Sequence, residues 1–242
     1  MDPSAAFPNP LPGHSLREEV YEYLRAEMNR GELPPGTFLD LNQLARRIGV
    51  SRTPLREALL HLETQGFVTV LPRKGFRLNS LSLADIANYF EIIGALEAAT
   101  MLSVGPSLGP DDLARMRRLN LAMLEAVSGN DFTGYYELNL EFHEVYLGRS
   151  RNRQLLDLMR PLKRRLYDWP RREGFVKAWE EESVQVEHEQ LLRLLERGAI
   201  AEAAHYLQHV HWSFTLQEPY IHAYYFASMG SRPGPAGGAR GC

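Results

Sequence analysis

The chain has 242 residues and a formal net charge of −3, and its 44% hydrophobic and 24% charged residues are ordinary for a globular protein with a packed core. The single cysteine, Cys242, excludes an intramolecular disulfide framework and favours a reducing compartment, so we expect a cytoplasmic protein. No apolar run reaches the roughly 18 residues that a membrane-spanning helix needs, and we expect no membrane partner.

The two ends of the chain differ in composition from the rest. Residues 1–14 are rich in Pro and lack the features of a secretory signal, and residues 228–242 are rich in Gly and Pro. Such segments bury too little apolar surface to fold, so we expect a disordered arm and a disordered tail. Between them the spacing of apolar residues predicts two domains, over residues 15–79 and 80–227.

The first domain has the element order of a winged helix-turn-helix. Apolar spacing predicts a helix over residues 15–30, which the segment "GELPPG" ends, and a second helix over 41–48. A third helix is predicted from Ser51 to Gln65. The sequence "FVTVLPRKGFRLN" then predicts a β-hairpin. In this fold the third helix enters the major groove of DNA and the hairpin lies beside it.

The start of the third helix, "SRTPLREALL", has a basic face and an apolar face. We expect Ser51 to cap the helix through its hydroxyl, while Pro54 fits the first turn. Arg52 and Arg56 lie one turn apart, on the side opposite an apolar stripe. They could be a solvated surface, but residues 46–77 hold seven Lys or Arg against two Glu, a local balance of +5. Such a surplus favours contact with phosphates.

Residues 41–78, "LNQLARRIGVSRTPLREALLHLETQGFVTVLPRKGFRL", resemble the DNA-binding domain of GntR-type bacterial transcription regulators. The resemblance covers residues 15–79. It implies binding of double-stranded operator DNA by a homodimer on a pseudo-palindromic site, and one small domain alone makes too few base contacts for specificity. The DNA-contacting residues that the resemblance implies are Asn42, Arg52, Thr53 and Arg56, with Arg73, Lys74 and Gly75 in the wing.

The second domain is predicted to be an antiparallel bundle of about six helices, an architecture that can house a site in its interior. The expected helices span residues 83–104, 111–128, 132–148, 152–171, 175–197 and 201–218. Their order resembles the FCD domain, the effector-binding domain of the FadR-like branch of GntR regulators. The resemblance implies a small-molecule effector.

Three histidines stand at helix positions where apolar residues are expected. His143 follows Asn139 by one turn, and His188 and His211 lie on apolar stripes of two later helices. One such histidine is ordinarily a packing residue, but three with a nearby amide oxygen favour a divalent metal such as zinc or nickel. Similarity to FCD domains implies the ligands Asn139, His143, His188 and His211. The family spacing, counted forward from His188, leads to Val210, which lies between His209 and His211. His209 therefore stays an alternative to His211 as the last ligand.

One position departs from the family pattern. Many FCD regulators that bind carboxylic acids carry an Arg four residues before the equivalent of Glu97, and this chain has Ile93 there. An anionic effector would then need another cation, and the candidates in the run "RPLKRR" are Arg160, Lys163, Arg164 and Arg165. This run is more simply a solvated helix face, and the effector could also be uncharged.

The sequence thus favours a ligand-responsive regulator, most often a repressor in this family. One alternative is a metal-free regulator with an apolar ligand. Another is a metal-dependent hydrolase or lyase fused to a DNA-binding domain. Glu144 and Glu187 adjoin two of the histidines, but neighbours on a helix point about 100° apart, and no pair of nucleophile and base is present. We therefore expect no enzymatic activity.

Overall fold

The computed structural model describes residues 15–29, 32–167, 180–181 and 183–223. The expected disordered ends, residues 1–14 and 228–242, lie outside these residues. So do the C-terminal end of the helix predicted over 152–171 and most of the first part of that predicted over 175–197.

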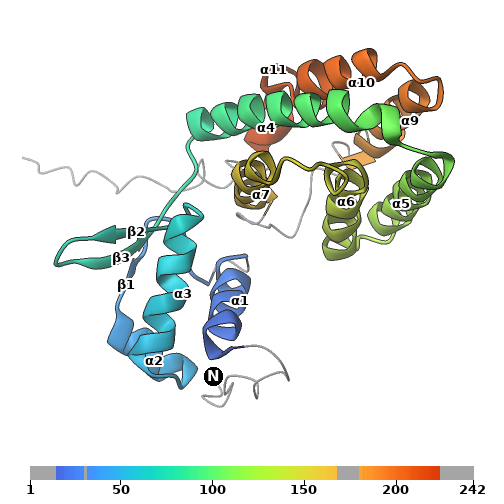
Figure 1. The fold of residues 1–242 in the computed structure, drawn as a ribbon. Coiled ribbons are helices and arrows are strands. Elements are labelled where there is room, and N and C mark those ends of the chain that lie inside the picture. The colour runs from blue at the N-terminus through green and yellow to red at the C-terminus, as the bar shows by residue number, and fades with distance from the viewer. Residues whose placement is uncertain (1–14, 30–31, 168–179, 182, 224–242) are drawn as a thin grey trace, which may run out of the picture.

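The N-terminal domain is a winged helix-turn-helix (Figure 1). Its elements are α1 (Leu16–Asn29), β1 (Phe38–Leu39), α2 (Leu41–Ile48), α3 (Arg52–Thr64), β2 (Val68–Leu71) and β3 (Gly75–Leu78). The predicted hairpin pairs β2 with β3, and the short β1, which the sequence did not indicate, pairs antiparallel with the other edge of β3. The core formed by these elements includes Leu24, Leu55, Leu59, Phe67 and Phe76.

The turn between α2 and α3 has the predicted glycine at the end of α2 but lacks the predicted side-chain cap at the start of α3. Gly49 ends α2 with a φ of 73°, in the left-handed region that glycine adopts without strain. Ser51 is the N-cap residue of α3, but its side chain makes no capping hydrogen bond, contrary to our expectation. The reason is local: the third residue of the helix is Pro54, which has no N–H to donate.

The C-terminal domain is helical, as predicted (Figure 1). Its elements are α4 (Leu83–Val104), η1 (Gly105–Ser107), α5 (Pro110–Ser128), α6 (Phe132–Leu147), α7 (Arg153–Tyr167), η2 (Ser183–His188), α9 (Glu189–Glu196), α10 (Ile200–Tyr206), η3 (Leu207–His211) and α11 (Phe214–Ile221). The helix expected over residues 201–218 is therefore not continuous. It widens into a π turn at η3 and is interrupted before α11. None of the described helices is long and apolar enough to cross a bilayer.

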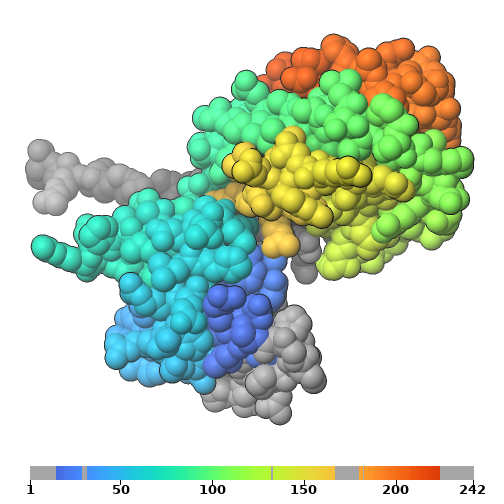
Figure 2. Space-filling model, viewed as in Figure 1, coloured from blue at the N-terminus to red at the C-terminus, as the bar shows by residue number. Residues whose placement is uncertain are grey.

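The two domains have separate cores joined by a short junction. Leu78 packs in the core of the winged domain and Leu81 in that of the helical domain, so only Asn79 and Ser80 lie between them. In Figure 2 the yellow surface of α7 meets the blue-green surface of the winged domain.

Candidate DNA interface and metal centre

The N-terminal end of α3 presents the residues expected to contact DNA. Arg52, Thr53 and Arg56 are all exposed there, and Asn42 is exposed on α2. The guanidinium of Arg52 donates to Oδ1 of Asn42 over 3.3 Å, so side chains of both helices form one polar surface. Such a surface can donate to base edges and to phosphates.

The tip of the β2–β3 hairpin forms the predicted wing. Arg73 and Lys74 are exposed, and the N–H of Lys74 donates to the carbonyl of Leu71 over 3.0 Å to close the turn. Gly75 has a φ of 89°, which disfavours any other residue there. The guanidinium carbon of Arg56 lies 5.9 Å from the ring centroid of Phe76 in β3, so the start of α3 packs against the wing, and both carry exposed basic side chains.

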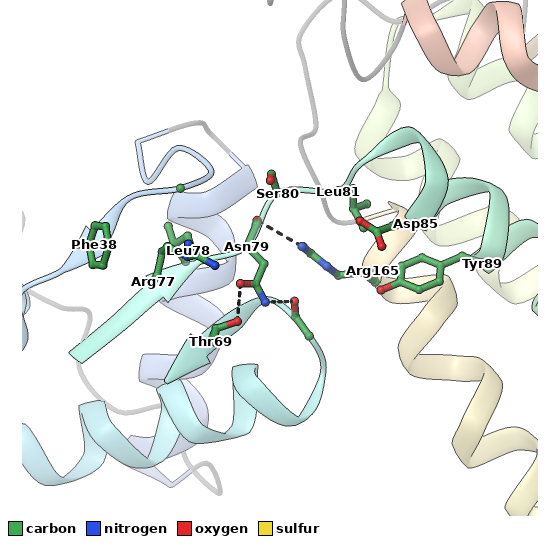
Figure 3. A pocket seen from close by; sticks show the side chains of 12 residues that line it. Phe38, Thr69, Arg77, Leu78, Asn79, Ser80, Leu81, Asp85, Tyr89 and Arg165 are labelled. Carbon is green, nitrogen blue, oxygen red and sulfur yellow. Dashed lines mark hydrogen bonds between the residues drawn. The ribbon is translucent and has the colours of Figure 1, made fainter. Parts of the chain in front are cut away.

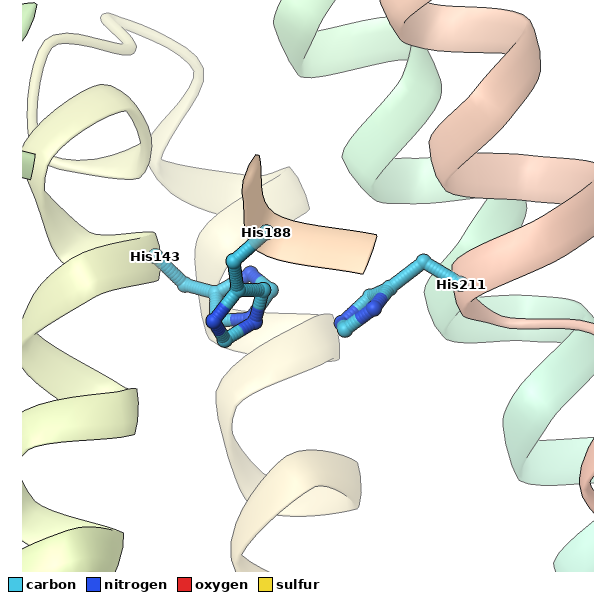
Figure 4. A group of neighbouring side chains, drawn as sticks. All are labelled: His143, His188 and His211. Atoms are coloured by element: carbon cyan, nitrogen blue, oxygen red, sulfur yellow. The ribbon is translucent and has the colours of Figure 1, made fainter. Parts of the chain in front are cut away.

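His143, His188 and His211 lie together in the helical domain (Figure 4). They come from α6, from the end of η2 and from the end of η3. The distances between ring centroids are 5.5 Å for His143 and His188, 5.1 Å for His143 and His211, and 5.2 Å for His188 and His211. One nitrogen of each lies within 4.8 Å of the others. We call these three residues the histidine cluster.

Each histidine of the cluster is held through its Nδ1 atom by a partner outside the cluster. Nδ1 of His211 lies 2.7 Å from an oxygen of Glu187, and Nδ1 of His188 lies 3.2 Å from Oδ1 of Asn120. Nδ1 of His143 lies 2.8 Å from the hydroxyl of Tyr146 and 3.2 Å from Glu97. These partners can each accept a hydrogen bond from a protonated Nδ1. The lone pair of each ring is then on Nε2, which is the arrangement typical of metal-binding histidines.

Burial keeps His143 and His188 neutral. The pKa of His143 is lowered to about 4, first by its removal from water and then by the positive charge of Lys163. Burial, with the neighbouring histidines, also lowers the pKa of His188 far below its ordinary value. Nε2 of both residues is buried without a hydrogen-bond partner among the described residues. Two unprotonated, desolvated nitrogens that face a third imidazole fit a divalent metal.

The structure separates the two candidates for the last ligand position. His211 belongs to the cluster, whereas His209 is exposed and its ring lies 4.4 Å from that of His205. The π turn of η3 explains the ambiguous register, because a π helix has one more residue per turn than an α-helix and so shifts which residue faces inward. Asn139 is buried on α6, one turn before His143.

Glu97 occupies the centre of a buried polar network beside the cluster. Its carboxylate accepts hydrogen bonds from Tyr146 over 2.6 Å, from the indole of Trp212 over 2.9 Å and from Lys163 over 2.5 Å. Burial alone would raise the pKa of Glu97, but the charge of Lys163 and the hydrogen bonds with His143 and Lys163 outweigh it and hold the pKa well below its ordinary value. Glu97 is therefore ionised and paired.

The basic run "RPLKRR" is not the uniform solvated face that we expected. Lys163 and Arg165 are 4% and 1% exposed, while Arg164 is exposed and Arg160 pairs with Glu144 at the surface. Two of these side chains are buried because Lys163 forms an ion pair with Glu97 inside the bundle and Arg165 contacts the winged domain. Sequence reasoning missed both as buried residues.

The two carboxylates weighed for an enzymatic role have other partners. Glu144 is exposed and forms its ion pair with Arg160. Glu187 uses one oxygen to hold His211 and the other to accept from Gln217 over 2.6 Å. Neither is left to act as a general base at an open metal position.

Fold and site together are those of a DNA-binding regulator with a winged helix-turn-helix domain followed by a helical domain. The family model for bacterial regulatory proteins of the gntR family matches residues 16–78, and the FCD domain model matches residues 88–211. The chain therefore belongs to the GntR family of bacterial transcription regulators and carries an FCD domain; it is not an enzyme.

Similar proteins agree with this assignment. A relative in Agrobacterium vitis, named as an uncharacterized HTH-type transcriptional regulator, is 33% identical over 129 residues, which are 52% of this chain and 75% of the relative. The Nta operon transcriptional regulator of Aminobacter aminovorans is 31% identical over 161 residues, covering 66% and 72% of the two chains. The solved structure of McbR/YncC from E. coli has the same fold, with a TM-score of 0.69 and 24% identity over 87% of this chain and 99% of that one.

Proposed function

We propose that this chain is a ligand-responsive repressor that acts in the cytoplasm and binds a pseudo-palindromic operator as a homodimer. The observation that carries the DNA-binding part is that the start of α3 packs against the wing and both carry exposed basic side chains, Arg52, Arg56 and Lys74. Thr53, Asn42, Arg73 and Gly75 complete the proposed interface.

The proposed cofactor is a divalent metal, zinc or nickel, bound by Asn139, His143, His188 and His211. What supports it is the combination of two buried Nε2 atoms without partners and three Nδ1 atoms held from outside. A bound metal would supply a positive charge and a coordination position for an oxygen of the effector. An amide oxygen is neutral and so a weaker donor than a carboxylate, and we expect a lower affinity than a site with Asp in place of Asn139 would have.

The effector we propose is a small molecule that reaches the metal from within the bundle. Ile93 is fully buried and offers no charge. Of the four basic residues weighed above, Lys163 is the one paired with Glu97 next to His143, so a carboxylate effector would meet Lys163 there. An uncharged effector would instead leave the pair of Glu97 and Lys163 intact.

The homodimer is proposed to form through α4. Ile92, Ala95, Ala99 and Leu102 are exposed on one side of this helix, within a quarter of its circumference. Exposed apolar stripes of this kind mark interaction surfaces. A twofold axis would bring the same stripe of both subunits together.

Metal analysis of chelator-treated protein reloaded with Zn²⁺ or Ni²⁺ tests the site. We expect one tightly held metal per chain in the wild type, and its loss in His143→Ala, His188→Ala and His211→Ala. The matched control is His209→Ala, which removes an exposed imidazole four residues from another and would remove only weak surface binding. Loss of the tight metal in His209→Ala but not in His211→Ala would assign the ligand to His209. An unchanged metal content in His143→Ala and His188→Ala would leave the three histidines as packing residues.

Operator binding by the same samples tests the regulatory role. An operator selected from a random-sequence DNA pool with the wild-type protein provides the probe. We expect its affinity to change when metal and candidate carboxylic acids are added, because a ligand that prefers one dimer geometry shifts the population toward it. An affinity that stays constant under all these additions would contradict ligand responsiveness.

A further inference from the structure

Helix α7 carries two buried basic side chains that point to different domains. Lys163 and Arg165 are buried, whereas Arg164 between them is exposed. Residues two apart on a helix lie about 200° apart around its axis, so these two side chains leave α7 in nearly opposite directions. α7 lies between α4 and the winged domain (Figures 1 and 2).

Lys163 connects α7 to the histidine cluster. Its ammonium lies 2.5 Å from Oε1 of Glu97 and 5.3 Å from the ring centroid of Trp212. The other oxygen of the same carboxylate lies 3.2 Å from Nδ1 of His143. One carboxylate therefore separates α7 from a proposed metal ligand, and a displacement of His143 acts directly on the ion pair that holds α7.

Arg165 connects α7 to the winged domain (Figure 3). Its guanidinium carbon lies 4.7 Å from the ring centroid of Phe67, and its Nη2 donates to the carbonyl of Asn79 over 3.3 Å. Phe67 is fully buried in the core of the winged domain. A planar guanidinium placed over a ring and bonded to a carbonyl has little freedom to turn.

Asn79 in turn is fastened to the winged domain at three points. Its N–H donates to the carbonyl of Phe67 over 2.9 Å. Its side chain accepts from the hydroxyl of Thr69 over 2.7 Å and donates to the carbonyl of Gly66 over 2.8 Å. A contact to Asn79 is therefore a contact to the whole winged domain.

Arg165 lies at a cavity between the two domains. A cavity of about 540 Å³ lies here, lined by Phe38 and Arg77 of the sheet and by Asp85 and Tyr89 of α4 (Figure 3). This space leaves room for the winged domain to change its angle about the junction.

We propose that Arg165 is the positioning residue that fixes the orientation of the winged domain, and that α7 couples this orientation to the histidine cluster through Lys163 and Glu97. The coupling step rests on the proposed metal site. Lys163 and Arg165 both follow Pro161 and lie within one turn of α7, so a displacement at Lys163 is carried to Arg165 half a turn away. Both the cluster and the winged domain then bias the position of the same helix, which is the physical requirement for coupling.

Intrachain distances between the two domains test the proposal in the full-length protein. Glu57 on α3 and Arg118 on α5 are exposed and suit spin labels at Glu57→Cys and Arg118→Cys, with Cys242→Ser to remove the native thiol. Dilution with unlabelled chains restricts the measurement to one subunit. The matched control is Arg164→Ala, which removes an exposed charge from the same helix. Arg165→Lys accompanies Arg165→Ala because it keeps the buried charge and so favours folding.

We expect a narrow distance distribution in the wild type and in Arg164→Ala, and a shift of its maximum when Zn²⁺ is added. Arg165→Ala and Arg165→Lys should broaden the distribution and lose the shift, while Zn²⁺ still binds at one per chain. If the distance distributions of the Arg165 variants were as narrow as that of Arg164→Ala, the positioning role of Arg165 would be overturned. A wild type that binds Zn²⁺ without a shift, or Arg165 variants that keep the shift, would overturn the coupling.

The double variant Glu97→Gln/Lys163→Met tests the other end of the helix. It removes both charges together, so no unpaired charge is left buried. We expect this variant to bind Zn²⁺ and to keep a narrow distance distribution whose maximum does not shift when Zn²⁺ is added. A retained shift would overturn the proposed coupling through Lys163. If Zn²⁺ binds to no protein, the wild type included, the proposed metal site fails and the coupling with it. The widths of the distance distributions measured without metal would still test whether Arg165 positions the winged domain.

Discussion

Glu187 and His211 form a hydrogen bond of 2.7 Å between a carboxylate oxygen and Nδ1, and both side chains are nearly buried. A carboxylate in this place fixes the orientation of the imidazole and makes its other nitrogen a better donor to a metal. The other oxygen of Glu187 is held by Gln217, so the carboxylate itself is immobile.

We predict that Glu187→Gln lowers metal affinity without abolishing it. Loss of such an outer partner typically costs about 10- to 100-fold in affinity. Titration of chelator-treated protein with Zn²⁺ against a competing chelator measures the change. Glu189→Gln is the control, because Glu189 pairs with Arg117 at the surface. Equal losses in both variants would contradict a special role of Glu187.

In DNA binding, Arg52→Ala and Arg56→Ala should each weaken specific binding by about 1–3 kcal/mol, the cost of losing a bidentate contact to a base. Lys74→Ala should weaken binding to all sequences alike and reduce its dependence on salt, because a wing lysine neutralises phosphates. Binding measured on the selected operator and on random DNA, at several salt concentrations, separates the two effects. If Arg52→Ala bound both DNAs as the wild type does, α3 would not be the reading helix.

The dimer should survive removal of the winged domain. We expect residues 80–222 alone to form the dimer in light scattering, and Ile92→Glu or Leu102→Glu to yield monomers because a charge would be buried in the apolar contact. Leu121→Glu on α5 introduces the same charge at an exposed leucine outside the α4 stripe and should leave the dimer intact. A monomeric helical fragment beside a dimeric N-terminal fragment would reverse the assignment.

Glu180 should make the protein less stable as pH rises. Burial raises its pKa from 4.5 to about 8, the charge of Glu187 adds to this, and a hydrogen bond with Tyr135 opposes it. The folded state binds the proton more tightly than the unfolded state, so stability from this group is complete below pH 4.5 and is lost as pH rises toward 8.

Glu180→Gln should therefore gain stability over the wild type across this pH range, by on the order of a few kcal/mol at alkaline pH. Denaturant unfolding at a series of pH values measures the gain. Glu125→Gln, at an exposed position on α5, should follow the wild type throughout. A constant difference between Glu180→Gln and the wild type would show that folding does not raise the pKa of Glu180.

Much of the fold follows from local sequence signals. Gly49 ends α2 and the wing turns at Gly75 because each needs a positive φ that glycine supplies. The histidines were found because polar residues on apolar stripes are conspicuous. Lys163 could have been found in the same way, since Leu156, Met159 and Leu166 form a buried stripe that it completes.

Other parts of the site have no local signal. Glu187 lies 24 positions from His211, Asn120 lies 68 from His188, and Lys163 lies 66 from Glu97, so only the packed bundle brings the partners together. The π turns also escape prediction, because a period of 3.6 residues was assumed throughout. Arg165 follows Leu158 and Leu162 at helical spacing, but Leu158 is exposed, and the ring that covers Arg165 belongs to another domain.

The two-residue junction has a consequence for protein engineering. Chimeric regulators are commonly built by exchanging one domain at the linker, on the assumption that the linker is inert. Here Asn79 belongs structurally to the winged domain, and its carbonyl receives Arg165 of the helical domain. A hybrid that takes its reading head from this chain and its sensor from another would fold yet lack the matching arginine. If Arg165 couples the two domains as proposed, such a hybrid would bind its operator without responding to its ligand unless Arg165 were introduced into the new sensor domain.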